Sequence, residues 1–233
     1  MKIIGHRGAR ALSPENTIAS FEKAIEHGVD AIELDVRVSR DGVAVVHHDA
    51  AIINPDGSEV IIARTSYAEL LRHKPDLAAL DHVIRTVAHR CQIVIEIKPD
   101  VPTKQTVRII RDRLKRGWQL KEFAVASFDF DALQHMREQL PGVQLIVNET
   151  WSGIRALRRA RRLSTKRISM SELWLYAAYL RMMKRRGIQL IIFPPNRKFW
   201  FMRSSVVNSP ERMKRWRKLV YGIVTDRPDL FEK

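Results

Sequence analysis

The chain has a single cysteine, Cys91, among its 233 residues, which excludes an internal disulfide framework. Cys91 comes directly before an apolar run, and this position favours a buried thiol over a nucleophile. No apolar run approaches the length of about 18 residues that a membrane-spanning helix needs. The apolar start at residues 1–8 is too short for a secretory signal. These absences predict a cytoplasmic protein without a membrane span.

Acidic residues are scarce in one part of the chain. Residues 151–220 contain 19 basic residues (Lys and Arg) but only 2 acidic ones (Asp and Glu). Residues 1–150 contain 20 basic and 21 acidic residues. The formal net charge of +15 therefore comes from this basic part. Such asymmetry suggests an anionic partner surface, although solvated helix faces explain it equally well. No helix-turn-helix, zinc-finger or RNP pattern is present, so no specific nucleic-acid partner is expected.

Short apolar runs alternate with amphipathic stretches, in a chain whose 45% hydrophobic and 29% charged residues are typical of a folded protein. A first helix is expected after Ser13-Pro14-Glu15, with Ser13 as its N-cap. Most pairs of strands after the third are separated by a helix. The predicted strands lie near residues 3, 32, 44, 94, 125, 145, 191 and 223. This order predicts a single α/β domain over residues 1–233, folded as a (β/α)₈ TIM barrel, with a doubly wound open sheet as the competing layout.

Polar side chains stand at the ends of the predicted strands, and their placement favours the barrel. In a (β/α)₈ barrel the carboxyl ends of all strands converge on one rim, where active sites are found. Residues far apart in the sequence can therefore share one pocket. The side chains expected at this rim are His6, Glu33, Asp35, His47 or His48, Glu96, Lys98 and Ser127.

Three of these side chains are carboxylates that suit a metal ion. Glu33 and Asp35 lie on one face of a strand because side chains alternate with a period of two. Glu96 ends an apolar run, where an isolated buried acid would be costly without a compensating charge. Such carboxylates suit one hard divalent cation, Mg²⁺ or Ca²⁺. Surface salt bridges are the alternative, and the apolar neighbours of Glu33 and Asp35 argue against them.

Histidines and cations complete the candidate site. His6 and one of His47 and His48 are candidates for acid–base chemistry, because imidazole titrates near neutral pH. The alternation of apolar residues does not distinguish His47 from His48. Arg7 and Lys98 supply positive charge, either for structural ion pairs or for phosphoryl oxygens. Acids, cations and two imidazoles together indicate phosphodiester cleavage rather than carbonyl chemistry.

The chain resembles the glycerophosphodiester phosphodiesterase family in an ordered set of motifs that spans nearly its whole length. The set begins with His-Arg-Gly at 6–8, Glu-Asn-Thr at 15–17, Glu-Leu-Asp at 33–35 and His-Asp at 48–49. It continues with Glu-Ile-Lys at 96–98, Ser-Phe-Asp at 127–129 and Val-Thr-Asp-Arg-Pro-Asp at 224–229. The resemblance implies a TIM barrel that hydrolyses glycerophosphodiesters to glycerol 3-phosphate and an alcohol.

The resemblance also implies a role for each matching residue. Glu33, Asp35 and Glu96 become the metal ligands, and His6 and His48 become the acid–base pair. Arg7 and Lys98 become contacts of the substrate phosphate, and Asn16 becomes a further polar contact. One histidine would deprotonate the attacking oxygen, from water or from the glycerol hydroxyl of the substrate, while the other protonates the leaving alcohol.

The chain departs from the family pattern at the end of the seventh strand, where Trp-Thr-Val-Asn is usual and Phe193-Pro194-Pro195-Asn196 stands here. Phe193 can keep the apolar wall of the substrate site. The segment that follows carries Phe199, Trp200 and Phe201 among basic residues, which predicts a lid, a substrate wall or peripheral contact with an anionic membrane.

Two alternative functions follow from these features. One is a lysophospholipase D-like or phosphoinositide-type phosphodiesterase that acts on membranes through the same rim and metal. The other is a non-catalytic basic binding protein. The presence of every acid, histidine and cation that the chemistry needs argues against it. The sequence leaves open the leaving alcohol and the oligomeric state.

Overall fold

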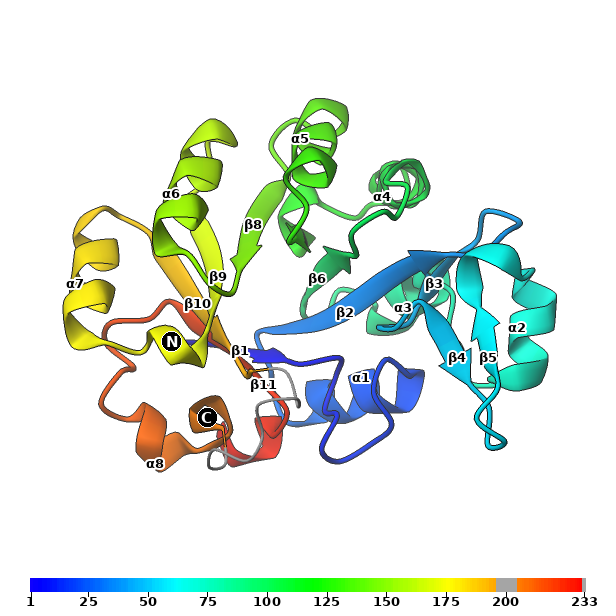
Figure 1. Ribbon diagram of the computed structural model, residues 1–233, viewed down its shortest axis with the longest axis horizontal. Helices are drawn as coiled ribbons and strands as arrows, with labels where there is room; N and C mark the ends of the chain where they lie inside the picture. The colour runs from blue at the N-terminus through cyan, green and yellow to red at the C-terminus, as the bar shows by residue number, and fades with distance from the viewer. Residues whose placement is uncertain (196–204, 232–233) are drawn as a thin grey trace.

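The computed structural model describes residues 1–195 and 205–231, and in this part of the chain eight parallel strands close into a barrel (Figure 1). β1 pairs in parallel with β2 on one side and with β11 on the other, which joins the two ends of the sheet. The strands are β1 (Lys2–Gly5), β2 (Ala31–Val38), β6 (Gln92–Ile97), β7 (Phe123–Ser127), β8 (Gln144–Glu149), β9 (Arg167–Ser171), β10 (Gln189–Phe193) and β11 (Gly222–Thr225). The TIM barrel prediction is confirmed, and the open sheet is excluded.

The number of barrel strands was right, but one predicted strand lies outside the barrel and one barrel strand was not predicted. The strand predicted near residue 44 is β3 (Ala44–Val46), which runs antiparallel to the end of β2 and lies outside the closed barrel. The strand β9 was not predicted at all. It pairs in parallel with both β8 and β10 and supplies the sixth strand of the barrel.

Helices surround the barrel in the connections between its strands (Figure 1). The elements are α1 (Ile18–Glu26), α3 (Leu80–Val87), α4 (Lys104–Leu114), α5 (Phe130–Gln139), α6 (Gly153–Arg162), α7 (Ala177–Arg185) and the short α8 (Pro210–Met213). α1 begins later than predicted, because Thr17 rather than Ser13 is its N-cap and accepts from the backbone of Ser20. Asn16, just before it, has a positive φ of 59°, so the helix cannot extend back to Pro14.

Side chains alternate between two apolar layers. On β2, the outward Ile32, Leu34 and Val36 pack in the main core between the barrel and its helices. A smaller core inside the barrel consists of Ile4, Ala31, Val94, Ala124, Ala126, Ile146, Ile191 and Val224. Six of these inner residues also line the cavity above them, so the inner core forms the floor of the candidate site.

An insertion between β2 and α3 carries β3, β4 (Ala51–Ile53), β5 (Glu59–Ile61) and α2 (Tyr67–His73), on the right of Figure 1. It has a separate small core of Val45, Ile52, Ile62, Leu70 and Leu77. The loop after β3 brings His47 and His48 to the barrel. None of the helices described in the structure has the length and hydropathy to span a membrane.

Candidate active site

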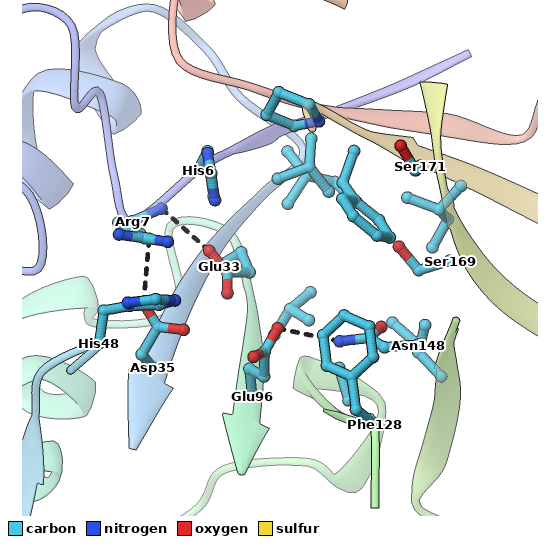
Figure 2. A pocket seen from close by; sticks show the side chains of 18 of the residues that line it. His6, Arg7, Glu33, Asp35, His48, Glu96, Phe128, Asn148, Ser169 and Ser171 are labelled. Atoms are coloured by element: carbon cyan, nitrogen blue, oxygen red, sulfur yellow. Dashed lines mark hydrogen bonds and ion pairs between the residues drawn. The ribbon is translucent and has the colours of Figure 1, made fainter. Parts of the chain in front are cut away.

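Three buried carboxylates converge at the carboxyl ends of β2 and β6. Glu33 and Asp35 point inward from β2, and the parallel register places Asp35 beside Glu96 of β6. Their side-chain oxygens lie within 4.8 Å of one another. Their exposed fractions are only 6%, 1% and 9%, which excludes surface salt bridges as the explanation for these acids. Figure 2 shows the three side chains pointing toward one another in the cavity.

Two cations contact these carboxylates without neutralising them. Lys98 Nζ lies 2.6 Å from Asp35 Oδ1 and also contacts Glu96 Oε1. Arg7 Nε lies 3.1 Å from Asp35 Oδ2, while the Arg7 backbone N–H donates to Glu33 Oε2 at 3.0 Å. Counted as formal charges, three carboxylates and two cations leave an excess of one negative charge, and Arg7 is also shared with Glu15 at 2.5 Å. Such an excess favours the binding of a further cation.

The ionisation of the three acids reflects this imbalance. Burial raises the pKa of Glu33 well above its ordinary value, and the nearby charges of Asp35 and Glu96 raise it further. Burial acts on Asp35 in the same direction, but Lys98 and Arg7 outweigh it and hold the pKa of Asp35 below its usual range. Glu33 is therefore the acid that most lacks a compensating charge. Oxygen ligands of this kind fit Mg²⁺ or Ca²⁺.

Asn16 fixes Asp35 from the other side. Its Nδ2 donates to Asp35 Oδ2 at 2.9 Å, and its Oδ1 accepts from the Asp35 backbone N–H at 3.3 Å. The positive φ of Asn16 turns the side chain toward β2, a conformation that asparagine tolerates better than most residues. Asn16 thus contacts a predicted metal ligand and is fully buried with it. Its first role in this structure is to orient a carboxylate.

The loop that carries Arg7 depends on Gly8. Gly8 has a φ of +87°, and a Cβ at this position would lie 2.4 Å from Ser20 Oγ and 2.5 Å from the Ser20 carbonyl carbon. The backbone of α1 therefore leaves no room for a side chain at residue 8. This contact holds the loop close to α1, and the Ser20 hydroxyl donates to the Arg7 carbonyl at 2.9 Å.

Gly8→Ala is expected to lower the free energy of unfolding by about 3 kcal/mol, because a steric clash with backbone adds to the strain of a positive φ. Gly28→Ala is the matched control, since Gly28 also has a positive φ of 68° but nothing within 4 Å of the added Cβ. About 1 kcal/mol is expected for the control. Urea unfolding of both variants measures the difference, and equal losses would refute the packing argument.

His6 is held by a buried carboxylate from the last strand of the barrel. Its Nδ1 lies 2.6 Å from Oδ1 of Asp226, which directly follows β11. Asn208 Nδ2 donates to the other oxygen of Asp226 at 2.9 Å, and Arg10 Nε lies 3.0 Å from Oδ1. Burial raises the pKa of Asp226, but His6, Arg10 and Asn208 outweigh it and lower this pKa to about 2. An ionised Asp226 accepts from the Nδ1–H of His6 and leaves Nε2 as the proton acceptor.

His48 has a similar arrangement at the other side of Arg7. Its Nδ1 lies 2.7 Å from Asp49 Oδ1, and its backbone carbonyl accepts two hydrogen bonds from Arg37. His48 lines the cavity, whereas His47 does not and contacts the Asp49 carbonyl at 3.0 Å instead. The structure therefore brings His48 to the carboxylates and leaves His47 outside the cavity.

The remaining wall of the cavity comes from β7, β8, β9 and β10. The cavity has a volume of about 700 Å³. Phe128 and Phe193 line it with their rings 6.1 Å apart in an edge-to-face contact, and Asn148 Nδ2 donates to Glu96 Oε2 at 2.9 Å. Ser169 and Ser171 face it from β9. In Figure 2, Asn148, Ser169 and Ser171 lie across the carboxylates from His6 and His48. One wall is thus charged, and the facing wall is apolar and hydroxyl-bearing.

Several of these residues were absent from the predicted site. Asn148 follows an apolar run as Glu96 does, so its position at a strand end was a usable signal. Asp226 belonged to a recognised motif, but nothing in the sequence connects it with His6. Ser169 and Ser171 were missed because β9 was missed. The predicted wall or lid residues Phe199, Trp200 and Phe201 lie outside the described residues, whereas Phe193 lines the cavity as expected.

Comparison with known proteins points to one family. The model of the glycerophosphoryl diester phosphodiesterase family matches residues 6–230. The Bacillus subtilis protein YhdW is 26% identical over all of this chain and 97% of its own length. A glycerophosphodiester phosphodiesterase of Bacillus altitudinis is 26% identical over 63% of this chain and 65% of its own.

Solved structures agree with the closed barrel described above. A glycerophosphodiester phosphodiesterase from Thermotoga maritima superposes with a TM-score of 0.76 at 26% identity, covering 99% of this chain and 96% of that one. A phosphodiesterase of Oleispira antarctica, in complex with the product sn-glycerol-3-phosphate, superposes with a TM-score of 0.81 at 21% identity. That comparison covers 98% of this chain and 94% of the other.

Proposed function

Since the chain belongs to the glycerophosphoryl diester phosphodiesterase family, we propose that it hydrolyses glycerophosphodiesters to glycerol 3-phosphate and an alcohol. The observation that carries the proposal is the uncompensated carboxylate cluster beside two histidines in one cavity. The product named for the Oleispira antarctica relative, sn-glycerol-3-phosphate, is the expected product here.

Glu33, Asp35 and Glu96 would hold one divalent cation, Mg²⁺ or Ca²⁺. The fit rests on the donor set, because three carboxylates within 4.8 Å of one another offer only oxygen ligands and carry an excess negative charge over Arg7 and Lys98. When bound, such a cation polarises a phosphoryl oxygen and offsets the charge that develops on it. A divalent cation would turn the excess of one negative charge into one positive charge, which matches the single negative charge of a phosphodiester.

Arg7 and Lys98 would orient the substrate by its phosphodiester group. Lys98 is buried and Arg7 is half-buried at the cavity, and both already contact Asp35, so their positions are fixed before a substrate enters. Fixed donors contribute more to catalysis than flexible ones, because no reorganisation is needed as charge develops. Asn16 supports this arrangement through Asp35 rather than through the phosphate itself.

His6 and His48 would carry the protons. Each donates Nδ1–H to a carboxylate, so each presents Nε2 to the reaction. Burial lowers the pKa of both rings, which keeps an imidazole neutral and able to accept a proton. One histidine, neutral and with a free Nε2, takes the proton of the attacking oxygen, from water or from a glycerol hydroxyl. The other enters the step as the imidazolium and gives its Nε2 proton to the leaving alcohol.

Asp226→Asn is expected to lower kcat by about 10²-fold or more, because an amide no longer fixes the Nδ1–H tautomer of His6. Asp229→Asn is the matched control, since Asp229 pairs with Arg227 and does not contact His6. Steady-state kinetics with a soluble glycerophosphodiester measure both variants. Retention of wild-type kcat in Asp226→Asn would contradict the orienting role.

A second candidate function is phosphodiester hydrolysis of lysophospholipids. The apolar side of the cavity favours it, because Phe128, Phe193, Trp151 and Leu173 offer a surface for an acyl chain. A substrate panel that compares glycerophosphocholine with lysophosphatidylcholine, in Mg²⁺ and in Ca²⁺, distinguishes the two. A kcat/KM at least ten-fold higher for the lysolipid would favour this second function.

A further inference from the structure

Four of the most exposed large apolar side chains in the described part of the chain lie on two adjacent loops of the active-site rim. Two come from the turn between β8 and α6 and from the first turn of α6, and two from the segment between β9 and α7. They are Trp151, Ile154, Leu173 and Tyr176, with exposed fractions of 62%, 66%, 48% and 64%. Trp151 and Leu173 also line the mouth of the cavity. We refer to these four side chains as the apolar rim cluster.

The backbone beneath the apolar rim cluster is held in place. Glu149 Oε1 accepts from the backbone N–H groups of Thr150 and Trp151 at 3.0 Å each, and Arg155 pairs with both oxygens of Glu149. Trp174 Nε1 donates to the Thr150 carbonyl at 2.8 Å, which ties the second loop to the first. The apolar side chains are therefore presented by a fixed platform.

Positive charge lies on α6, the helix that carries Ile154 of the apolar rim cluster. α6 contains five arginines and no acid, and it lies beside α7 in Figure 1. Arg158 and Arg161 are exposed and have no ion-pair partner among residues 1–195 and 205–231. They follow Ile154 at i+4 and i+7, which places them on the same face of the helix. Arg159 reaches back toward the rim, where its Nη1 donates to the Phe128 carbonyl at 3.0 Å.

We propose that the apolar rim cluster and the exposed face of α6 dock on an anionic lipid surface. Exposed apolar side chains beside arginines gain from lipid in two ways, by leaving water and by meeting negative headgroups. A nucleic acid would pair its phosphates with the arginines, but it would not remove the apolar side chains of Ile154 and Leu173 from water. A second copy of this face would bring five arginines of each α6 together. Docking places the mouth of the cavity at the membrane surface, and it needs no turnover, so it stands independently of the proposed function.

Co-sedimentation with vesicles tests this docking. The wild-type protein is expected to bind vesicles of equal parts phosphatidylglycerol and phosphatidylcholine at low salt, and to bind neither at high salt nor to phosphatidylcholine alone. Arg158→Glu/Arg161→Glu and Ile154→Ser are each expected to weaken binding by about ten-fold or more. Both variants should keep wild-type hydrolysis of glycerophosphocholine.

Matched controls separate this face from the overall charge. Arg108→Glu/Lys115→Glu makes the same change of charge at exposed positions on α4 and its C-cap, and Ile53→Ser removes an isoleucine that is 58% exposed on β4. Both controls should bind as the wild type does. Equal weakening by the controls, or no binding of the wild type to anionic vesicles, would overturn the proposal. So would binding of a DNA duplex at low salt without binding of the vesicles.

Discussion

Glu33→Gln is expected to lower kcat by about 10³-fold or more, since a bound divalent cation would contribute several kcal/mol of charge stabilisation and Glu33 is one of the three carboxylates proposed to hold it. Glutamine keeps the size of the side chain and the capacity to accept from the Arg7 backbone N–H. The substitution therefore removes a charge and little else.

Thermal unfolding gives a second measure of the Glu33 variant that does not depend on activity. Without a bound cation, Glu33→Gln is expected to raise the Tm, because it removes repulsion among three buried carboxylates. Mg²⁺ or Ca²⁺ should raise the Tm of the wild type but not of the variant. An ion-dependent shift that Glu33→Gln leaves unchanged would place the cation elsewhere.

His48→Asn is the second large effect that we expect, with a fall in kcat of about 10³-fold. His48 lines the cavity beside Arg7 and the carboxylates. Among the described residues that line the cavity, His6 and His48 are the only histidines. The variant should keep the Tm shift caused by Mg²⁺ or Ca²⁺, because His48 contacts Asp49 rather than the ligand oxygens.

His47→Asn is the matched control for the histidine experiment. The two histidines are adjacent in sequence, but His47 does not line the cavity and bonds to the Asp49 carbonyl. Its replacement should leave kcat within about two-fold of the wild type, as expected for a substitution outside a site. A large loss in His47→Asn with normal kcat in His48→Asn would reverse the assignment.

The carboxylate site was predictable because strand geometry alone determines it. Glu33 and Asp35 share a face of β2 by the period of two, and the polar end of the Gln92–Ile97 run marked Glu96 as a rim residue. The same rule failed for His47 and His48, because β3 ends at Val46 and both residues lie in a loop without a fixed alternation. The family motif, rather than local physics, selected His48.

The missed strand β9 shows where the alternation of apolar residues fails to predict a strand. Its inward residues are Arg167, Ser169 and Ser171, so only Ile168 and Met170 face the main core. A strand whose inner face lines a polar cavity carries too few apolar residues to stand out from a loop. Because polar Ser169 and Ser171 replace apolar residues on the inner face of β9, the sequence pattern did not indicate this strand.

The pairing of His6 with Asp226 depends on closure of the barrel. The two residues are 220 positions apart, and they meet because β1 pairs with β11 in parallel and places His6 beside the end of the last strand. No local pattern encodes this contact. Residue types at strand ends can therefore be predicted one at a time, whereas their hydrogen-bonded partners need the closed fold.

Release of glycerol 3-phosphate from glycerophosphocholine, measured in Mg²⁺ or Ca²⁺ and again in excess chelator, tests the proposed function most directly. The wild type should release glycerol 3-phosphate with at least one of the two ions and lose this activity in the chelator. Glu33→Gln should be inactive in all conditions. Full release in excess chelator, or no release with either ion, would contradict a cation-dependent glycerophosphodiester phosphodiesterase built on Glu33, Asp35 and Glu96.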